Sequence, residues 1–385
     1  MKIKENVLIS TLTTMRLGGP ARYVIEVESP EEVPAAYDFA RDHHLPTFIL
    51  GGGANTIGHD EGFDGVIIIN RMRGITDVTW TGDGAEGGPP KMHVPFLGEE
   101  SAGRTRPESE PVHGQDPLST IIEVMGGEIW DDVVQYTTNR NLTGIEALSK
   151  IPGLASAAPV QNIGAYGQEV ADTLTEIYAY DTKTNSFCTL SRSDLQFSYR
   201  KSILNTTKKN RYFVISITLA LKEGQMSRPF YNSIERYIEA NSLTDFSPQG
   251  IREIVSTIRA NKLPDPKDKA SSGSFFKNIY LNETEAASAE AKGYPVHHGK
   301  DGHKINSGWL IEQAGLAGQL LHGMRVSSAA ALVLINESAT SYDDLAKARD
   351  EIRNQVHAKF GYWLEQEPVE IINIHKESSI TNPGV

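Results

Sequence analysis

Residues 47–55 read Thr-Phe-Ile-Leu-Gly-Gly-Gly-Ala-Asn, a short apolar run that passes directly into three glycines. The apolar run predicts a buried β-strand, and the glycines let the backbone approach a ligand and present N–H groups to a phosphate. The spacing is neither that of a Rossmann fingerprint nor that of a Walker loop. Because glycine-rich turns often follow strands, a plain turn remains the competing interpretation.

The residues on both sides of this stretch predict an α/β unit. Residues 22–27 alternate between apolar and polar, as in a half-buried strand, and residues 66–70 form a second apolar run. Between them, Ser29 precedes Pro30 and is followed three residues later by Glu32, which indicates a helix start with a capping box. Strand, helix, strand, glycine loop and strand over residues 1–75 form one α/β building block.

Length and composition limit the class of protein. The chain has 385 residues, 39% of them apolar, and a net charge of −12. This length favours more than one domain, and the acidic balance argues against a nucleic-acid or anionic-membrane partner. The N-terminus lacks a signal-peptide pattern and no apolar run reaches about 18 residues, so we expect a cytoplasmic protein. Cys188 is the only cysteine, and no histidine stands at a metal-ligand spacing, so we expect no metal.

Residues 81–117 interrupt the pattern with proline, glycine and acidic residues and few large apolar ones. Such a composition indicates an inserted acidic loop. Beyond it, periodicity predicts helices at 129–137, around 251–258 and after Ser341. It predicts strands at 121–124, 176–180, 212–221, 332–336 and 362–372.

The stretch from Ile151 to Gly167 is rich in small residues, yet it carries Gln161, Asn162 and Tyr166. Small residues suit a backbone that packs against a flat ligand, and amide side chains suit a polar ring edge. A tight turn buried between sheets explains the composition equally well.

Ser274 stands in the segment Gly-Ser-Phe-Phe-Lys-Asn, residues 273–278. The nucleophile-elbow pattern of a serine hydrolase is missing. A serine hydroxyl can instead deliver a proton in a pocket that Phe275 and Phe276 help to keep dry. A strand serine with apolar neighbours is the plain alternative. Arg200, Glu367, Lys262 and Asn278 are each ordinary when taken singly.

Taken in order, these motifs resemble the UDP-N-acetylenolpyruvoylglucosamine reductase family. The series covers nearly the whole chain outside residues 81–117. It consists of Thr14 with Leu17-Gly-Gly-Pro-Ala21, Gly51–Asn55, Ile151-Pro-Gly153, Pro159-x-Gln-Asn-x-Gly-Ala-Tyr-Gly167, Tyr199-Arg-x-Ser202, Lys262-Leu-Pro-Asp-Pro266, Gly273–Asn278, Gly308-Trp-Leu-Ile311 and Trp363-Leu-Glu-Gln-Glu367. Each motif is weak alone, but the ordered set is specific.

The resemblance implies a mixed α+β and α/β fold: a two-part FAD-binding domain of the PCMH/VAO type with a smaller α+β substrate-binding domain. The expected parts are residues 1–75, residues 76–222 with the insertion, residues 223–360, and a C-terminal strand at 361–385 that returns to the active site. It also implies noncovalent FAD, NADPH as co-substrate, and reduction of UDP-N-acetylglucosamine enolpyruvate to UDP-N-acetylmuramate for peptidoglycan synthesis. We expect small-molecule substrates, no nucleic-acid or membrane partner, and a monomer.

By the same resemblance, Ser274 gives a proton to C2 of the substrate, while Arg200 and Glu367 hold its carboxylate and offset the developing charge. The residues expected to bind FAD are Gly51, Gly52, Gly53, Ala54, Asn55, Ile151, Pro152, Gly153, Gln161, Asn162, Gly164 and Tyr166. Those expected to bind substrate are Tyr199, Tyr231, Lys262 and Asn278.

The chain departs from the family pattern at Thr13, Ala54, Lys150 and Ser156, where Asn, Ser, Gly and a Gly/Ser-rich turn are usual. These changes concern the flavin loops and spare the three expected catalytic residues. Two other functions stay open at this point. One is another flavin oxidoreductase of the same fold superfamily, and the other is a regulator that binds flavin or a nucleotide sugar without turnover.

Overall fold

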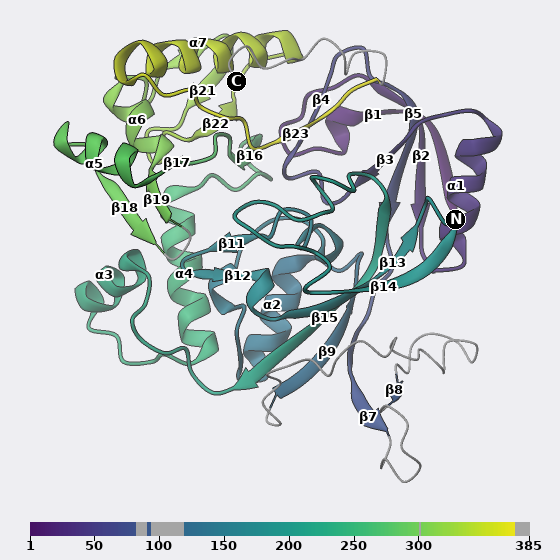
Figure 1. Cartoon of the computed structure of the whole chain (residues 1–385). Coiled ribbons are helices and arrows are strands. Elements are labelled where there is room, and N and C mark those ends of the chain that lie inside the picture. Colours follow the sequence, from purple (N-terminus) through teal and green to yellow (C-terminus); the bar gives the residue numbers. More distant parts are fainter. Residues whose placement is uncertain (82–90, 94–118, 300–301, 374–385) are drawn as a thin grey trace. The chain divides into compact units, whose positions relative to one another are not determined.

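The computed structural model describes residues 1–81, 91–93, 119–299 and 302–373 (Figure 1). The insertion predicted at 81–117 therefore lies largely outside the described residues. Backbone contacts divide the chain into two compact units. Unit 1 comprises Met1–Ile3, Ile25–Gly51 and Ile67–Arg259, and unit 2 comprises Lys4–Val24, Gly52–Val66 and Ala260–Val385. These boundaries differ from the four parts expected from the sequence, and that division stays a prediction.

The N-terminal residues form a four-stranded sheet that confirms the three strands predicted around the glycine loop. Its order is β1 (Lys2–Leu8), β2 (Pro20–Val27), β5 (Phe63–Asn70) and β3 (Thr47–Leu50), and α1 (Glu32–Asp42) lies between β2 and β3 in the chain. The apolar face of α1 is buried through Val33, Ala36, Tyr37 and Ala40, as its helical spacing predicts.

The predicted cap of α1 is wrong. The helix begins after Glu31, and no side chain caps its first turn. Ser29 accepts the Glu32 N–H through its backbone carbonyl, while the Glu32 carboxylate accepts the N–H of Glu28 (2.7 Å). The turn at Pro30 thus moves the helix start two residues beyond the expected one.

Unit 1 is built on an antiparallel sheet whose core is covered by α2 (Trp130–Asn139). Trp130, Val133 and Val134 of α2 pack on the same core as Ile122, Ile177 and Ile217 of the sheet. The sheet order is β14 (Ser186–Ser191), β13 (Leu174–Asp181), β15 (Tyr212–Glu223), β9 (Ser119–Met125) and β6 (Ile75–Asp77), with β10 (Leu142–Thr143) also paired to β15.

Two further helices belong to unit 1, α3 (Asn232–Asn241) and most of α4 (Pro248–Lys262). Their buried isoleucines, Phe230 and Ala147 form a second core. The smaller elements of this unit are β7 (Thr79–Thr81) with β8 (Lys91–His93), β11 (Gly164–Ala165) with β12 (Gln168–Glu169), and short 3₁₀ turns at Glu146–Leu148, Ala155–Ala157 and Val170–Asp172.

Unit 2 has a small antiparallel sheet with α6 and α7 packed against it (Figure 1). The predicted start of α7 is confirmed, because Ser341 accepts the N–H of Asp344 and the Asp344 side chain accepts the N–H of Ser341. The order of this sheet is β16 (Ser271–Ser274), β22 (Val333–Asn336), β21 (Met324–Val326) and β20 (Leu320–Leu321). A second sheet has the order β17 (Ile279–Leu281), β19 (Gly302–Ile305) and β18 (Val296–Gly299). The helices are α5 (Glu283–Ala291), α6 (Ser307–Gln313) and α7 (Tyr342–Phe360).

The strand predicted at 362–372 is much shorter than expected. Only β23 (Val369–Ile371) is regular, and it pairs in parallel with β4 (Thr56–Gly58). Before it, Gln366 forms a single bridge with Phe276. Pro368 has no N–H to donate, so a continuous ladder cannot pass through this position.

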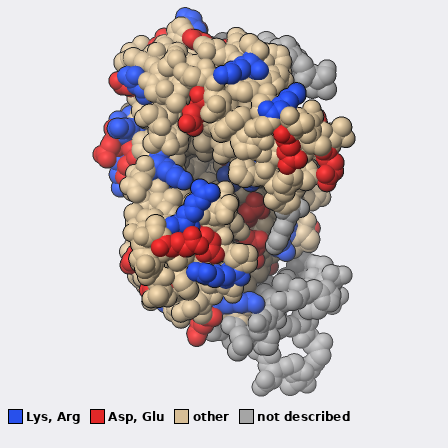
Figure 2. Space-filling model, turned by 90° about the vertical axis from the view of Figure 1, so that its left-hand side faces the viewer, with Lys and Arg blue, Asp and Glu red and all other residues tan. Residues whose placement is uncertain are grey.

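On the face drawn in Figure 2, the basic and acidic side chains of the described residues are interspersed, so neither sign of charge dominates that face. None of the helices among the described residues is long and apolar enough to cross a bilayer.

Candidate active site

The glycine loop after β3 is tightly packed against residues 12–14. Gly53 has φ +67°, and a Cβ atom built there would lie 2.0 Å from the carbonyl oxygen of Leu12. The N–H of Thr14 donates to the Gly53 carbonyl (3.1 Å). Any side chain at Gly53 would collide with backbone, so the glycine is required by this close approach and not only by a turn.

Two buried hydroxyls lie on the segments around this loop. The Oγ1 atom of Thr14 and the Oγ atom of Ser272 are buried and have no hydrogen-bond partner. Their segments are joined, since the N–H of Ser271 donates to the carbonyl of Thr14 (3.1 Å). A buried hydroxyl without a partner is costly, so both hydroxyls are candidates to bond a ligand near the glycine loop.

The residue before the Ile151-Pro152-Gly153 loop is held in a strained conformation. Lys150 has φ +60°, which a glycine adopts more readily, and both its N–H (2.7 Å) and its Nζ (2.9 Å) donate to Asp131. Arg252 of α4 reaches the same carboxylate through both Nη atoms (2.7 and 3.1 Å). We call Asp131, Lys150 and Arg252 the Asp131 cluster.

The Asp131 cluster is electrostatically favourable. Burial would raise the pKa of Asp131, but the hydrogen bonds from Arg252 and Lys150 outweigh it and lower the pKa to about 2. The departure from the usual glycine at position 150 is therefore accompanied by an ion pair that holds the lysine in place.

The segment from Gln161 to Tyr166 turns back on itself. Asn162 is buried with φ +46°, and its side chain donates to Glu169 (2.7 Å) and accepts the N–H of Ala171 (3.1 Å). These contacts show that Asn162 shapes the loop. Arg200, also in the left-handed region with φ +54°, donates from Nη2 to the Gly164 carbonyl (3.1 Å) and lies over the ring of Tyr199.

Tyr166 lies between Tyr231 and a buried arginine. Its ring meets the Tyr231 ring edge-on at 5.9 Å, and its hydroxyl interacts with Arg259. Arg259 also donates to the Lys150 carbonyl (3.2 Å). Burial lowers the pKa of the Arg259 guanidinium, although tyrosine and carboxylate neighbours oppose the shift. Tyr231 itself is half exposed.

Within unit 1, Gly51 borders a small pocket of about 90 Å³ that Ser156 and Ala157 also line. A Cβ atom at Gly51 would lie 2.9 Å from the Cβ of Ala157. Gly51 and the altered residue Ser156 thus lie at the same cavity, whose other lining residues are largely apolar.

Within unit 2, Ser274 and Glu367 lie on neighbouring segments. Ser274 ends β16 after Gly273, which has φ +70°, and its partner across the sheet is Val333. The N–H of Glu367 donates to the carbonyl of Phe275 (2.9 Å), and Asn55 Nδ2 lies 3.5 Å from the Glu367 carbonyl. Phe275 and Phe276 are buried, so the backbone of the two proposed catalytic residues is fixed against an apolar core.

Asn278 follows this strand and contacts the start of α6. Its Oδ1 accepts the N–H of Ser307 (3.2 Å), and the Ser307 hydroxyl donates to the carbonyl of Lys277. Lys277 Nζ pairs with Glu365. Contacts with α6 and with the segment before Glu367 therefore fix the conformation of residues 277–278.

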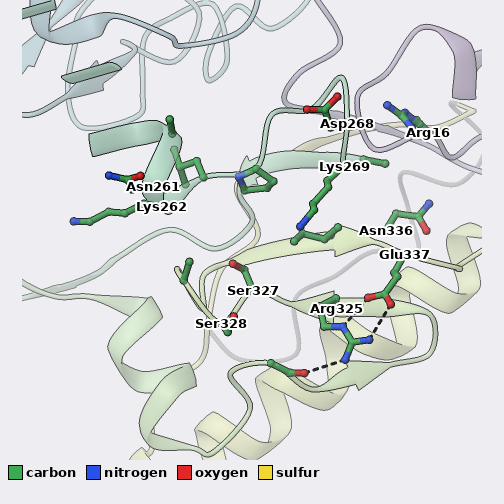
Figure 3. A pocket seen from close by; sticks show the side chains of 17 residues that line it. Arg16, Asn261, Lys262, Asp268, Lys269, Arg325, Ser327, Ser328, Asn336 and Glu337 are labelled. Carbon is green, nitrogen blue, oxygen red and sulfur yellow. Dashed lines mark hydrogen bonds and ion pairs between the residues drawn. The ribbon is translucent and has the colours of Figure 1, made fainter. Parts of the chain in front are cut away.

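A polar pocket of about 800 Å³ lies in unit 2 (Figure 3). Lys262 comes from the end of α4, Lys269 from the loop that follows, and Arg325 from β21. Arg325 is paired with Glu337 (2.6 Å), so Lys262 and Lys269 supply much of the positive charge. Arg16 donates to the carbonyls of Pro266 and Lys267 (3.0 and 2.5 Å) and so holds the loop between the two lysines.

The expected site residues divide between the units. In unit 2, the backbone of Glu367 bonds the carbonyl of Phe275, the residue after Ser274, and the side-chain amide of Asn55. Unit 2 also holds Lys262 and Asn278. Unit 1 holds Arg200, Tyr199 and Tyr231 with the Ile151 and Gln161 segments.

Several residues at these sites are not marked by the sequence. Asp131 and Arg252 are 121 positions apart and look like ordinary charges on helices. Arg259 stands three residues before Lys262 on the same helix, which is a weak signal of a shared site. Thr14 belongs to a quoted motif, whereas Ser272 and Lys269 carry no signal at all.

Comparison with known proteins defines the class first. A model of the FAD-binding domain matches residues 21–85, and a model of the C-terminal domain of UDP-N-acetylenolpyruvoylglucosamine reductase matches residues 265–371. The chain is thus a flavoprotein with an FAD-binding domain.

Whole-length relatives then give the family. The UDP-N-acetylenolpyruvoylglucosamine reductase of Bdellovibrio bacteriovorus is 30% identical over 96% of this chain and 99% of its own length. That of Ralstonia nicotianae is 31% identical over 93% of this chain and 96% of its own. The chain belongs to the UDP-N-acetylenolpyruvoylglucosamine reductase family. The enzyme of the same name from Thermus caldophilus matches with a TM-score of 0.60 at 22% identity, over 96% of this chain and 99% of the other, which confirms the predicted fold.

The residues present fit FAD. The three successive glycines of the Gly51–Asn55 segment leave their backbone N–H groups unobstructed by side chains, and the buried hydroxyls of Thr14 and Ser272 have no partner, so these groups suit a pyrophosphate. The Thr13 hydroxyl is 3.3 Å from the Ile9 carbonyl and 3.5 Å from that of Leu17, and so it serves the backbone of the preceding turn.

Proposed function

We propose that this protein reduces UDP-N-acetylglucosamine enolpyruvate to UDP-N-acetylmuramate with NADPH as the reductant. The observation that carries the proposal is the bond from the Glu367 N–H to the Phe275 carbonyl (2.9 Å), which sets Glu367 beside the strand of Ser274. A serine and a glutamate on neighbouring segments, whose backbone packs on the buried Phe275 and Phe276, support a role for the pair in protonating a carbanion-like centre.

FAD held by residues 51–55, 151–153 and 161–166 would supply hydride chemistry between NADPH and C3 of the enolpyruvyl group. The electron pair of the double bond then moves toward C2 and the carboxylate. Arg200 is proposed to bind that carboxylate, and Glu367 to offset the developing charge as a proton-bearing or hydrogen-bonded group. The Ser274 hydroxyl donates its proton to C2, which completes the addition of two hydrogens across the double bond.

A serine hydroxyl has too high a pKa to donate a proton unaided, so a cation must stabilise the alkoxide. Lys262 is proposed for this role. It lines the polar pocket of unit 2, where Lys269 adds a second charge, and the same pocket suits the diphosphate of the substrate.

The remaining substrate contacts are proposed as follows. Asn278 orients polar groups of the substrate from the start of α6, and Tyr231, half exposed at the ring of Tyr166, covers the UDP group. Tyr199 supports the Arg200 guanidinium from below its plane. All these residues come from one chain, so the proposal needs no second copy.

The other flavin reactions considered for this fold are less well supported. A covalently tethered flavin needs a reactive nucleophile, and burial raises the pKa of Cys188 to about 11. That thiol lies in β14, at the edge of the six-stranded sheet of unit 1. A binding protein without turnover gives no role to a serine and a glutamate on neighbouring segments.

The test separates the two half-reactions. Purified protein is expected to be yellow and to bleach when NADPH is added anaerobically, and the colour should return on addition of UDP-N-acetylglucosamine enolpyruvate. Ser274→Ala should bleach at the normal rate but lose at least about a hundredfold in the return of colour. Failure of the wild type to bind flavin would refute the function, and equal loss in both steps would refute the role of Ser274.

A further inference from the structure

The segment that carries Glu367 is held by a partly buried group of side chains around the carboxylate of Glu370. The Oε1 atom of Glu370 accepts from the Tyr342 hydroxyl (2.8 Å), Gln366 Nε2 (3.0 Å) and Arg349 Nη1 (3.2 Å). His59 Nε2 lies 2.9 Å from Oε2. We call these five residues the Glu370 cluster.

The cluster is largely shielded from solvent. The side chains of Glu370, His59 and Arg349 are 14%, 13% and 17% exposed. The rings of His59 and Tyr342 stack with centroids 3.6 Å apart. Burial would raise the pKa of Glu370, but the hydrogen bonds with His59, Gln366 and Tyr342 outweigh it and lower the pKa to about 2. The carboxylate is thus ionised and well bonded on both oxygens.

Two members of the cluster flank Glu367 in the chain. Gln366 stands immediately before it, and its amide bonds to Glu370, to the Pro368 carbonyl (2.9 Å) and, through Oε1, to Arg349 (3.2 Å). Residues 366–370 are therefore tied to one another across Glu367. We call residues 366–370 the arch. Arg349 of α7 bonds to the arch, and so does His59, the residue that follows β4.

Backbone pairing alone holds this arch weakly. β23 pairs with β4 over only Val369, Glu370 and Ile371, and Pro368 interrupts the ladder before it. On the other side, one bridge between Gln366 and Phe276, with the Glu367 N–H on the Phe275 carbonyl, joins these residues to the segment that follows Ser274. Such short pairings leave the place of Glu367 to be decided by the side chains that surround it.

We propose that the Glu370 cluster is a positioning device that sets the Glu367 side chain relative to Ser274. Its members act through Glu367 and do not touch the substrate. The inference rests on the function proposed above, because the protonation step is what Glu367 serves. Displacement by about 1 Å can lower a rate a hundredfold, so loosening the arch should slow that step selectively.

The test compares Glu370→Ala with Asp350→Ala. Asp350 is the solvent-exposed second partner of Arg349 (2.9 Å), so its loss leaves every contact of the Glu370 carboxylate in place. In Glu370→Ala, reoxidation of the reduced flavin by UDP-N-acetylglucosamine enolpyruvate should slow about tenfold, with reduction by NADPH changed less than about twofold. Asp350→Ala should match the wild type in both steps. Glu370→Gln should recover part of the rate, because an amide oxygen still accepts from Tyr342 and Gln366.

Amide hydrogen exchange supplies a readout that does not depend on turnover. The N–H groups of Glu367 and Val369 should exchange at least about tenfold faster in Glu370→Ala than in Asp350→Ala, with α6 unchanged. Unchanged exchange at these amides overturns the proposal, as does equal slowing of both half-reactions in a folded variant. If the wild type does not reoxidise with the substrate, the proposed function fails, and the exchange data alone then decide whether Glu370 holds the arch.

Discussion

The Asp131 cluster of unit 1 and the Glu370 cluster of unit 2 each hold a neighbouring segment of the chain, but they do so through different contacts. In each, a carboxylate whose pKa is lowered to about 2 stands beside a segment expected in the active site. Asp131 bonds the backbone N–H of Lys150 directly, and so it fixes the entry to the Ile151 loop. Glu370 reaches its segment only through side chains. Asp131 thus fixes a backbone position directly, whereas the Glu370 carboxylate adds side-chain contacts to the backbone bonds of Glu367 and Val369.

The largest expected effect comes from breaking the Asp131 cluster. In Asp131→Ala, the guanidinium of Arg252, whose side chain is 7% exposed, keeps only the Ser149 hydroxyl (3.0 Å) as a partner. We expect a loss of about 3 kcal/mol in the free energy of unfolding, measured by urea titration of the flavin-free protein. FAD should bind about tenfold more weakly, because the Ile151 loop loses its anchor.

Glu370→Ala is the control for that result, since it should change the FAD dissociation constant less than about twofold. Equal weakening of FAD binding in both variants would show that the clusters do not serve separate segments.

The second largest expected effect is a loss in the free energy of unfolding at low pH, which should begin at a different pH for each cluster. Each carboxylate has a lower pKa in the folded protein than in the unfolded chain, so its contribution is present above the unfolded pKa and is lost as pH falls toward about 2. The ordinary values are 4.5 for Glu370 and 3.8 for Asp131, so the Glu370 contribution should begin to fall at the higher pH. At pH 3 the Glu370 part of the loss should be about 2 kcal/mol.

Urea unfolding of wild type and Glu370→Gln between pH 7 and pH 3 measures this loss. The variant should show the shallower decline. Asp343→Asn, which removes an exposed pair with Lys347, should follow the wild type. If the stability of Glu370→Gln declines as steeply as that of the wild type, groups other than Glu370 cause the loss of stability at low pH.

The smallest expected effect concerns Lys150, which has φ +60°. Lys150→Gly relieves the left-handed strain but loses the ion pair with Asp131, whose lysine side is 52% exposed. We expect Lys150→Gly to be more stable than Lys150→Ala by about 1 kcal/mol, because both lose the ion pair and only glycine relieves the strain. Thermal unfolding measures it. If the alanine variant is as stable as the glycine variant, the left-handed conformation of residue 150 has no measurable cost while its N–H is bonded to Asp131.

Local sequence patterns were enough to predict the elements whose signals lie within a few residues. The cap at Ser341 and the strand–glycine loop at 47–55 are of this kind, since caps and turns are short-range chemistry. The cap of α1 was predicted wrongly from an equally good pattern. There the Glu32 carboxylate bonds upstream to the Glu28 N–H and the Ser29 side chain plays no part, which the pattern does not reveal.

The site required more than local patterns. The ordered motifs placed Ser274 and Glu367 in one family site, but not the contacts that hold them. His59 and Glu370 are 311 positions apart, and Asp131 and Arg252 are 121 apart. Each is a common surface residue type, and only the fold brings the partners to one buried point. The left-handed conformations of Lys150 and Arg200 are equally invisible, because neither residue type favours φ above zero.

The pairing of Glu367 with distant neighbours has a consequence for biosynthesis. Its carbonyl faces Asn55, 312 positions earlier, and the arch is completed only when β23 reaches β4. A ribosome makes the chain from its N-terminus, at about 5–20 residues per second. During translation, therefore, the nascent polypeptide has its glycine loop and Ser274 long before it has its glutamate. With the role proposed for Glu367, competence for the second half-reaction is among the last properties that the newly made protein acquires.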